Sequence, residues 1–132
     1  MRLNQITIPV TDIARSKAFY ERLGFRLLVD SPHYCRFLAP QGDTTFSLHV
    51  DGSVRPGAVI YLEADDVDGE FARLQQAGFS FETDPRDESW LWREAILLDP
   101  DGHKIKLYHA GSNRIDPPWR VTPKPKPATG AA

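Results

Sequence analysis

The chain has 132 residues, of which 41% are hydrophobic and 26% are charged, and its formal net charge is −2. This length suits a single domain, and this composition excludes a fibrous or wholly disordered chain. The presence of only one cysteine excludes an internal disulfide and a cysteine-rich zinc module. The near-zero net charge argues against nucleic acid as a partner.

Signals for membrane insertion and secretion are also missing from the sequence. The longest apolar run, residues 58–62, is far too short to span a bilayer, and the first residues lack the apolar core of a signal peptide. We therefore expect a cytoplasmic protein with no membrane partner.

The first predicted elements are a strand and a helix. Apolar residues alternate at Ile6, Ile8 and Val10, as on one face of a strand. Asp12 is suited to cap the start of a helix, and Gly24 is suited to end it. Further strands are predicted over residues 26–30, 34–39 and 44–50, and Cys35 follows the buried pattern of the middle one.

The second half of the chain repeats the first at a shift of 54 residues. Asp66 and Gly78 bound a helix of the same spacing as Asp12 and Gly24, and each glycine is followed by phenylalanine. The apolar alternation before the first helix recurs before the second. Strands are then predicted over residues 80–83, 90–98 and 104–109, the last two joined by a Pro-Gly turn at 99–102.

Each half is thus β-α-β-β-β, and the predicted fold class is α+β. Two βαβββ modules, with one helix each, pair their curved half-barrel sheets to form a cup. We place one domain at residues 1–110, with module one at about 1–52 and module two at about 56–110. Residues 111–121 are expected to be an ordered extension whose Pro-Pro-Trp-Arg segment docks on its own surface or on a partner subunit. Residues 122–132 are predicted to be a flexible Pro/Lys tail.

Strand alternation leaves one face of each sheet uncovered by its helix. Two such faces side by side would make a concave groove suited to a ligand. The residues predicted to line this ligand-binding cup are Gln5, Thr7, Ser47, His49, Val59, Tyr61, Trp92, Glu94, Lys106 and Tyr108. Arg36 is a further candidate that could clamp a ligand carboxylate. The sequence does not show on which face of the sheet Arg36 lies.

The segment before residue 95 carries aromatic side chains next to an acid. Trp90 and Trp92 share a strand parity with Glu94, so they form a stacking wall for a ligand, seal a dimer seam or pack the C-terminal segment. Hairpin pairing brings Glu94 near Lys106 or Tyr108. A Glu94–Lys106 contact would be either a rim salt bridge, which we prefer, or a pair that recognises a ligand. Glu94 and His49 are the candidate catalytic residues.

Residues 3–12 and 18–25 resemble the opening module of the vicinal oxygen chelate (VOC) superfamily, and residues 99–105 resemble its closing hairpin. That superfamily includes glyoxalase I, bleomycin-resistance proteins, fosfomycin-resistance enzymes and extradiol dioxygenases. The resemblance covers residues 1–110. It implies a cup built from two βαβββ modules, and it implies a homodimer, because members of the superfamily are often dimers.

The resemblance also implies where a metal site would lie in this sequence. Metal-dependent members place four ligands on the cup-facing strands, and these positions match Gln5, Ser47, Val59 and Lys106. Val59 has no donor atom, and Lys106 places a cation where a carboxylate is needed. We therefore expect no metal and no cofactor. The alternative is a divalent ion at a displaced site formed by Gln5, His49 and either Glu63 or Glu94.

The function expected from these observations is metal-independent binding of a small molecule, with sequestration of a drug or an aromatic metabolite in the cup. Bleomycin-resistance proteins are the nearest model, although Lys106 argues against bleomycin itself, which is strongly cationic. The alternative is a glyoxalase- or dioxygenase-like enzyme, either a lyase, isomerase or oxygenase with a non-standard metal site or a metal-free acid–base catalyst using Glu94, His49 or Lys106. A third possibility is an interaction protein with a vestigial cup.

Overall fold

The structure, a computed structural model, describes residues 1–121. Module one consists of β1 (Gln5–Val10), α1 (Ile13–Leu23), β2 (Arg26–Asp30), β3 (Tyr34–Leu38) and β4 (Thr45–Val50). Module two consists of β5 (Val59–Glu63), α2 (Val67–Gln76), β6 (Phe81–Asp87), β7 (Arg93–Leu98) and β8 (Lys104–His109), followed by the 3-10 turn η1 (Gly111–Asn113). The predicted tail, 122–132, lies outside the described residues.

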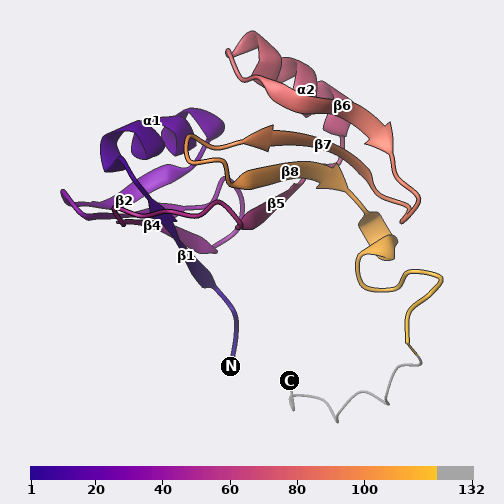
Figure 1. Cartoon of the computed structure of the whole chain (residues 1–132). Helices are drawn as coiled ribbons and strands as arrows, with labels where there is room; N and C mark the ends of the chain where they lie inside the picture. The colour runs from indigo at the N-terminus through magenta and orange to yellow at the C-terminus, as the bar shows by residue number, and fades with distance from the viewer. Residues whose placement is uncertain (122–132) are drawn as a thin grey trace.

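Each module folds its four strands into one mixed sheet. The strand orders are β1-β4-β3-β2 and β5-β8-β7-β6, and the first strand of each module runs parallel to the last. Helix α1 lies over the first sheet and α2 over the second (Figure 1). The α+β fold class and the two βαβββ modules are therefore confirmed.

The ends of α1 follow from the residues that the sequence places there. The Asp12 side chain accepts a hydrogen bond from the Arg15 N–H, which satisfies one of the free donors of the first turn. Gly24 has a φ of 112°, a left-handed conformation that a side chain would oppose. The predicted helix boundaries at Asp12 and Gly24 are therefore correct.

The strands of module two differ from the prediction at two places. Strand β6 extends to Asp87, and β7 begins only at Arg93. Residues between them form a turn, because the Glu88 N–H donates to the Trp92 carbonyl at 2.8 Å and the Leu91 N–H donates to the Glu88 carbonyl at 3.0 Å. Trp90 therefore lies in a turn and not in the predicted strand.

The two modules share one hydrophobic core on the helix-covered faces of their sheets. Buried residues from both halves form a single cluster that includes Leu48, Leu97 and Ile105. Phe19 of α1 meets Phe79, which follows α2, with ring centroids 5.4 Å apart in an edge-to-face arrangement. Neither module therefore buries its apolar face alone.

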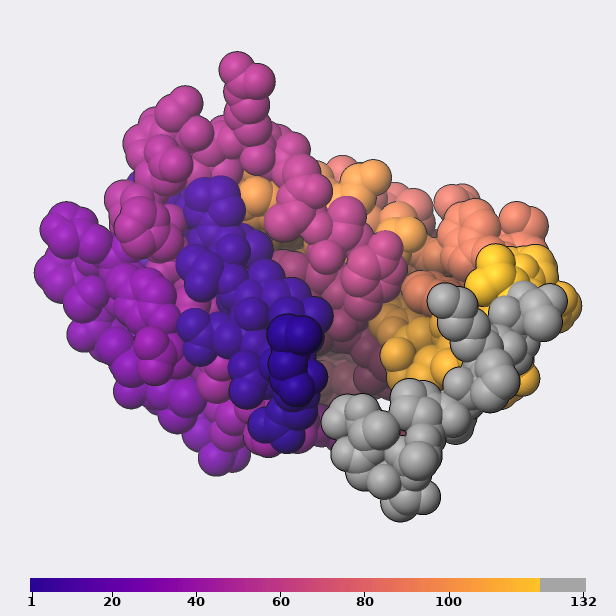
Figure 2. Space-filling model, turned by 90° about the horizontal axis from the view of Figure 1, so that it is seen from below, coloured from indigo at the N-terminus to yellow at the C-terminus, as the bar shows by residue number. Residues whose placement is uncertain are grey.

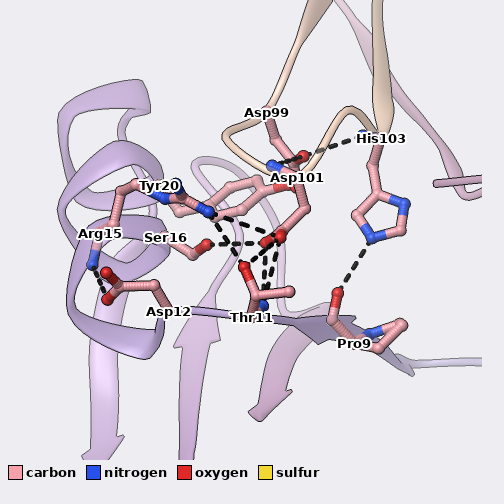
Figure 3. Close-up of polar contacts among 9 residues, drawn as sticks. All are labelled: Pro9, Thr11, Asp12, Arg15, Ser16, Tyr20, Asp99, Asp101 and His103. Atoms are coloured by element: carbon pink, nitrogen blue, oxygen red, sulfur yellow. Dashed lines mark hydrogen bonds and ion pairs between the residues drawn. The ribbon is translucent and has the colours of Figure 1, made fainter. Parts of the chain in front are cut away.

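A polar joint at the 99–102 turn fixes one module against the other (Figure 3). The Thr11 hydroxyl donates to Oδ1 of Asp101 at 2.6 Å. The buried His103 ring accepts a hydrogen bond at Nδ1 from the Ala58 N–H at 3.2 Å and donates from Nε2 to the Pro9 carbonyl at 2.9 Å. Three segments distant in the sequence thus meet at one hairpin.

Strands β1 and β5 are edge strands in their sheets, and they line opposite sides of one groove of about 980 Å³. Apolar residues from both sides face it, including Ile8 and Leu62, and Ile6 is 52% exposed. In Figure 2 the indigo N-terminal strand lies beside the magenta segment that leads into β5. No helix among residues 1–121 is long and apolar enough to cross a membrane.

Candidate functional site

Aromatic side chains gather on the open face of the second sheet. Trp92 stacks on Tyr108 with ring centroids 4.6 Å apart and an interplanar angle of 20°. Tyr61, from the edge strand β5, meets both rings edge-on at 6.0 and 5.7 Å. Burial, followed by the nearby charge of Glu63, raises the pKa of the Tyr108 phenol. The three rings form a continuous wall with Tyr61 at its exposed end.

A buried ion pair lies next to this wall. Lys106 Nζ lies 3.2 Å from Oε2 of Glu94, and the Glu94 side chain is only 3% exposed against 21% for Lys106. The register of β7 and β8 pairs Glu94 with Tyr108 and Ile96 with Lys106, so the ion pair is a diagonal contact across the two strands. This agrees with the prediction that Glu94 lies near Lys106 or Tyr108. The preferred interpretation as a rim salt bridge is wrong, because the Glu94 carboxylate is buried and not at the rim.

Trp90 completes the enclosure of Glu94. Its indole Nε1–H donates to Oε1 of Glu94 at 2.8 Å. Leu91, the next residue, has a φ of 66°, a left-handed conformation that is strained for a branched side chain and is observed at functional sites. The turn therefore holds Trp90 over the ion pair at the expense of backbone strain.

A second polar group lies on the open face of module one. The Tyr34 hydroxyl shares a 2.7 Å hydrogen bond with the buried Ser47 hydroxyl and accepts one from Nε of Arg36 at 2.9 Å. Burial acts to raise the pKa of the Tyr34 phenol, but the hydrogen bonds with Ser47 and Arg36 outweigh it and lower that pKa. Arg36 thus lies on the open face, directly opposite Ser47 in the strand register.

Tyr34 was missed by the sequence reasoning, although a signal for it existed. Cys35 and Phe37 are apolar and alternate with Tyr34 and Arg36, and both are fully buried. Strand alternation then places Tyr34 and Arg36 on the opposite face. The buried state of Cys35 confirms its predicted place in the core.

The remaining predicted residues lie on edge strands or are exposed to solvent. Gln5 and Thr7 are exposed on β1, and the Gln5 side-chain oxygen accepts a hydrogen bond from the Thr45 hydroxyl at 2.8 Å. His49 is also exposed, opposite Tyr34 in the register. Val59 is exposed on β5 and lines the groove between β1 and β5.

The structure therefore brings the predicted residues together in two groups. Tyr61, Trp92, Glu94, Lys106 and Tyr108 form one, and Arg36 joins Ser47 in the other. Within residues 1–121, no hydrogen bond or ion pair connects the two groups. The modules contact each other instead through the shared core and the polar joint.

The residues at the superfamily's metal positions do not fit a divalent ion. The Lys106 ammonium is held by Glu94, Val59 has no donor, and the Ser47 hydroxyl is a neutral ligand already bonded to Tyr34. In the part of the chain that the structure describes, no three His, Cys, Asp or Glu side chains converge as a metal-binding group.

Glu63, one member of the alternative metal site, has another role. Its carboxylate accepts hydrogen bonds from the N–H groups of Ala110 and Gly111 at 2.8 and 3.0 Å. Partial burial acts to raise the pKa of Glu63, but these two bonds, helped by the charges of His109 and Arg114, lower it. Glu63 thus anchors the start of the C-terminal extension.

The extension itself lies away from the body of the domain (Figure 1). Its contact with the aromatic wall is a long hydrogen bond of 3.5 Å from the Trp92 indole to the Asn113 carbonyl. Trp119 is 57% exposed and Ile115 is also exposed. The Pro-Pro-Trp-Arg segment is therefore not buried against its own described chain.

Comparison with known proteins identifies the family. The model of the Glyoxalase/Bleomycin resistance protein/Dioxygenase superfamily matches residues 2–107, most of the chain. The chain belongs to this superfamily. No curated protein sequence gives a match.

Solved structures of this VOC superfamily share its fold. A member from Sphaerobacter thermophilus is 26% identical, with a TM-score of 0.69 over 83% of this chain and 97% of that one. A bleomycin-binding protein solved with bleomycin is 23% identical, with a TM-score of 0.67 over 83% and 98%. A member from Nocardioides is 17% identical, with a TM-score of 0.77 over 92% and 90%. At these sequence identities the comparisons show a shared fold.

Proposed function

We propose that this chain is a metal-independent small-molecule-binding protein that sequesters a drug or an aromatic metabolite. The observation that carries the proposal is the wall of Tyr61, Trp92 and Tyr108 beside the Glu94–Lys106 pair. Tyr61 is 49% exposed and Trp90 is 40% exposed, so both side chains are accessible to a flat ligand. A mainly aromatic surface with a few fixed polar groups is typical of a ligand site.

The relatives support a binding function. One structural neighbour is described as a bleomycin-binding protein and another as a bleomycin resistance determinant, so this fold serves small-molecule binding elsewhere. The donor chemistry at Val59 and Lys106 supports metal independence. The free thiol of Cys35 in the core suits a reducing compartment, and we place the function in the cytoplasm.

We further propose that two copies assemble into a homodimer through the edges of β1 and β5. Both edges carry unpaired backbone groups, and the groove between them exposes apolar side chains such as Ile6. A second copy can cover both edges and bring its module one to face module two of the first. That arrangement supplies Arg36, His49 and Gln5 to a cup whose aromatic wall they do not reach within one chain.

Titration of the full chain tests this proposal. After treatment with EDTA, a panel of aromatic drugs that includes bleomycin is added while intrinsic tryptophan fluorescence is recorded. We expect saturable quenching by at least one compound without added metal, a loss of about tenfold or more in affinity for Trp92→Ala, and no change for Trp119→Phe. Binding that requires a metal ion, or turnover of the compound, would instead support the enzyme alternative.

The assembly is tested separately, by sedimentation. The wild-type chain is expected to sediment as a dimer, and Ile6→Glu, which places a charge in the groove, as a monomer. Leu28→Glu, an exposed apolar position on β2, is the matched control and should leave the dimer intact. A wild-type monomer at high concentration would contradict the homodimer.

A further inference from the structure

The surroundings of the Lys106 ammonium group have the form of a binding site for an organic cation. The Nζ atom lies 5.6 Å from the ring centroid of Tyr61 and 5.7 Å from that of Trp90. Both distances are within the range of cation–π attraction. The carboxylate of Glu94, 3.2 Å away, supplies the counter-charge. Two aromatic faces and one buried anion are the elements with which proteins recognise ammonium ligands.

We propose that Lys106 is the resident occupant of this cage, and that its presence makes the site select aromatic ligands bearing an anionic group while rejecting organic cations. This inference rests on the proposed binding function and adds the class of ligand. A lysine on the adjacent strand is tethered at an effective concentration on the order of millimolar or higher, so a free ammonium ligand competes poorly with it.

The polar partners within the cage also favour an anionic ligand. Both carboxylate oxygens of Glu94 are engaged, Oε1 by the Trp90 indole and Oε2 by Lys106. Lys106 has three N–H donors, and Glu94 is the one side chain that pairs with its ammonium among residues 1–121. The site therefore presents spare donors and no spare buried anion, which suits a carboxylate or phenolate on the ligand.

The loop that carries Trp90 supports a cage built for this purpose. Leu91 holds a left-handed φ of 66°, and the 88–92 turn closes through a 2.8 Å backbone hydrogen bond from Glu88 to Trp92. A regular strand at this point would not place the Trp90 indole over both Glu94 and Lys106. The strain is thus associated with the one wall of the cage that comes from outside the sheet.

Two probes of opposite charge test the proposal by calorimetry on the full chain: 2-naphthoate and trimethyl(phenyl)ammonium. In wild type, naphthoate is expected to bind at least about tenfold more tightly than the ammonium. Lys106→Met should raise the ammonium affinity about tenfold and lower the naphthoate affinity about tenfold. Glu94→Gln added to Lys106→Met should remove the gain in ammonium binding.

The matched control is Lys104→Met, two residues earlier on the same face of β8 but exposed. It should leave both affinities within about twofold, because an exposed charge contributes little. If circular dichroism shows that Lys106→Met is unfolded, Lys106→Gln replaces it. If the Lys106 variants leave the ratio of the naphthoate and ammonium affinities unchanged, the proposal is overturned.

Failure of the cage proposal can be distinguished from failure of the proposed binding function. If wild type binds neither probe nor any member of the drug panel, the binding function is contradicted. A gain of ammonium binding in Lys106→Met then still supports the cage, and the absence of such a gain overturns it. If wild type binds aromatic compounds with no preference for charge, the cage alone is contradicted.

Discussion

The hydroxyl group of Tyr20, on α1 of module one, donates a 2.7 Å hydrogen bond to Oδ2 of Asp99, at the hairpin turn of module two. Both side chains are buried. Burial, followed by the charge and hydrogen bond of Asp99, raises the pKa of the Tyr20 phenol, so it stays a donor throughout the ordinary pH range. The other Asp99 oxygen accepts from the N–H groups of Asp101 and His103. This one carboxylate thus orders its own turn and fastens it to the other module.

Tyr20→Phe is expected to lower the free energy of unfolding by about 1–3 kcal/mol, because it leaves a buried carboxylate oxygen without its donor. Urea denaturation followed by circular dichroism measures the change. Tyr61→Phe serves as the control for stability, since its exposed hydroxyl makes no hydrogen bond within residues 1–121, and it should fall within about 0.5 kcal/mol of wild type. Equal effects of the two substitutions would contradict the role of the Tyr20–Asp99 bond.

Glu63 is expected to make stability depend on acidity. Its folded pKa lies below the ordinary 4.5, so the carboxylate stabilises the fold above that pH, and this contribution is lost as pH falls through the folded pKa. Glu63→Gln should therefore lower the free energy of unfolding by about 1 kcal/mol at pH 7, with the gap closing as the pH falls through the lowered pKa of Glu63. Glu82→Gln, an exposed acid on β6, should show neither effect. A gap independent of pH would contradict this linkage.

A side chain at Gly102 is expected to destabilise the fold. Its φ is +88°, and an added Cβ would meet the Pro56 ring at 3.3 Å. Gly102→Ala should lower the free energy of unfolding by about 1–2 kcal/mol because of the left-handed backbone alone. Gly52→Ala is the matched control, since nothing lies within 4 Å of the position, and it should be neutral or slightly stabilising. Similar melting temperatures for both variants would contradict the argument.

Cys35 is expected to resist alkylation. Burial raises the pKa of its thiol to about 11, and the residue is fully buried. In the folded state the reactive thiolate therefore does not form at pH 8, and an alkylating reagent cannot reach the sulfur. Iodoacetamide at pH 8 should label the folded chain far more slowly than the urea-unfolded chain, as measured by mass spectrometry. The same shift predicts stability that falls as pH rises above about 9, because only the unfolded thiol then ionises. Rapid labelling of the folded chain would show that β3 opens.

Removal of residues 114–132 tests the extension. Trp119 and Ile115 find no cover on the described chain, so we expect the extension to contact the partner subunit. A chain that ends at Asn113 should keep its circular dichroism spectrum but dissociate at higher protein concentration than wild type, as measured by analytical ultracentrifugation. An unchanged dimer dissociation constant would exclude a role in assembly.

Most of the fold is readable from the sequence because alternation and helix caps act locally. Asp12, Gly24 and Asp66 each determine a boundary through contacts within a few residues, and the 54-residue repeat adds a second copy of every signal. The turn at Trp90 was not predicted, because its aromatic and aliphatic residues favour a strand. The hydrogen bond from the Trp90 indole to Glu94 and the backbone hydrogen bond from Glu88 to Trp92 impose the turn instead.

The candidate site was readable in part. Strand pairing placed Glu94 near Lys106 or Tyr108, because the hairpin turn fixes the register of the two strands. In the structure Glu94 faces Tyr108, and Lys106 is its diagonal neighbour. The burial of that pair was not readable, since it depends on where Trp90 lies after the turn. Nor could spacing along strands show that Ser47 and Lys106 belong to separate groups within one chain, because that depends on how the modules pack.

The exposed segment between β4 and β5 connects two halves that already hold each other. The shared core around Leu97 and the joint at His103 persist whether or not residues 51–57 are continuous. A single proteolytic cut in that segment would remove only the entropic advantage of a tether, which varies slowly with loop length. The two fragments should therefore remain associated as a nicked complex, and co-expressed halves should reconstitute the domain.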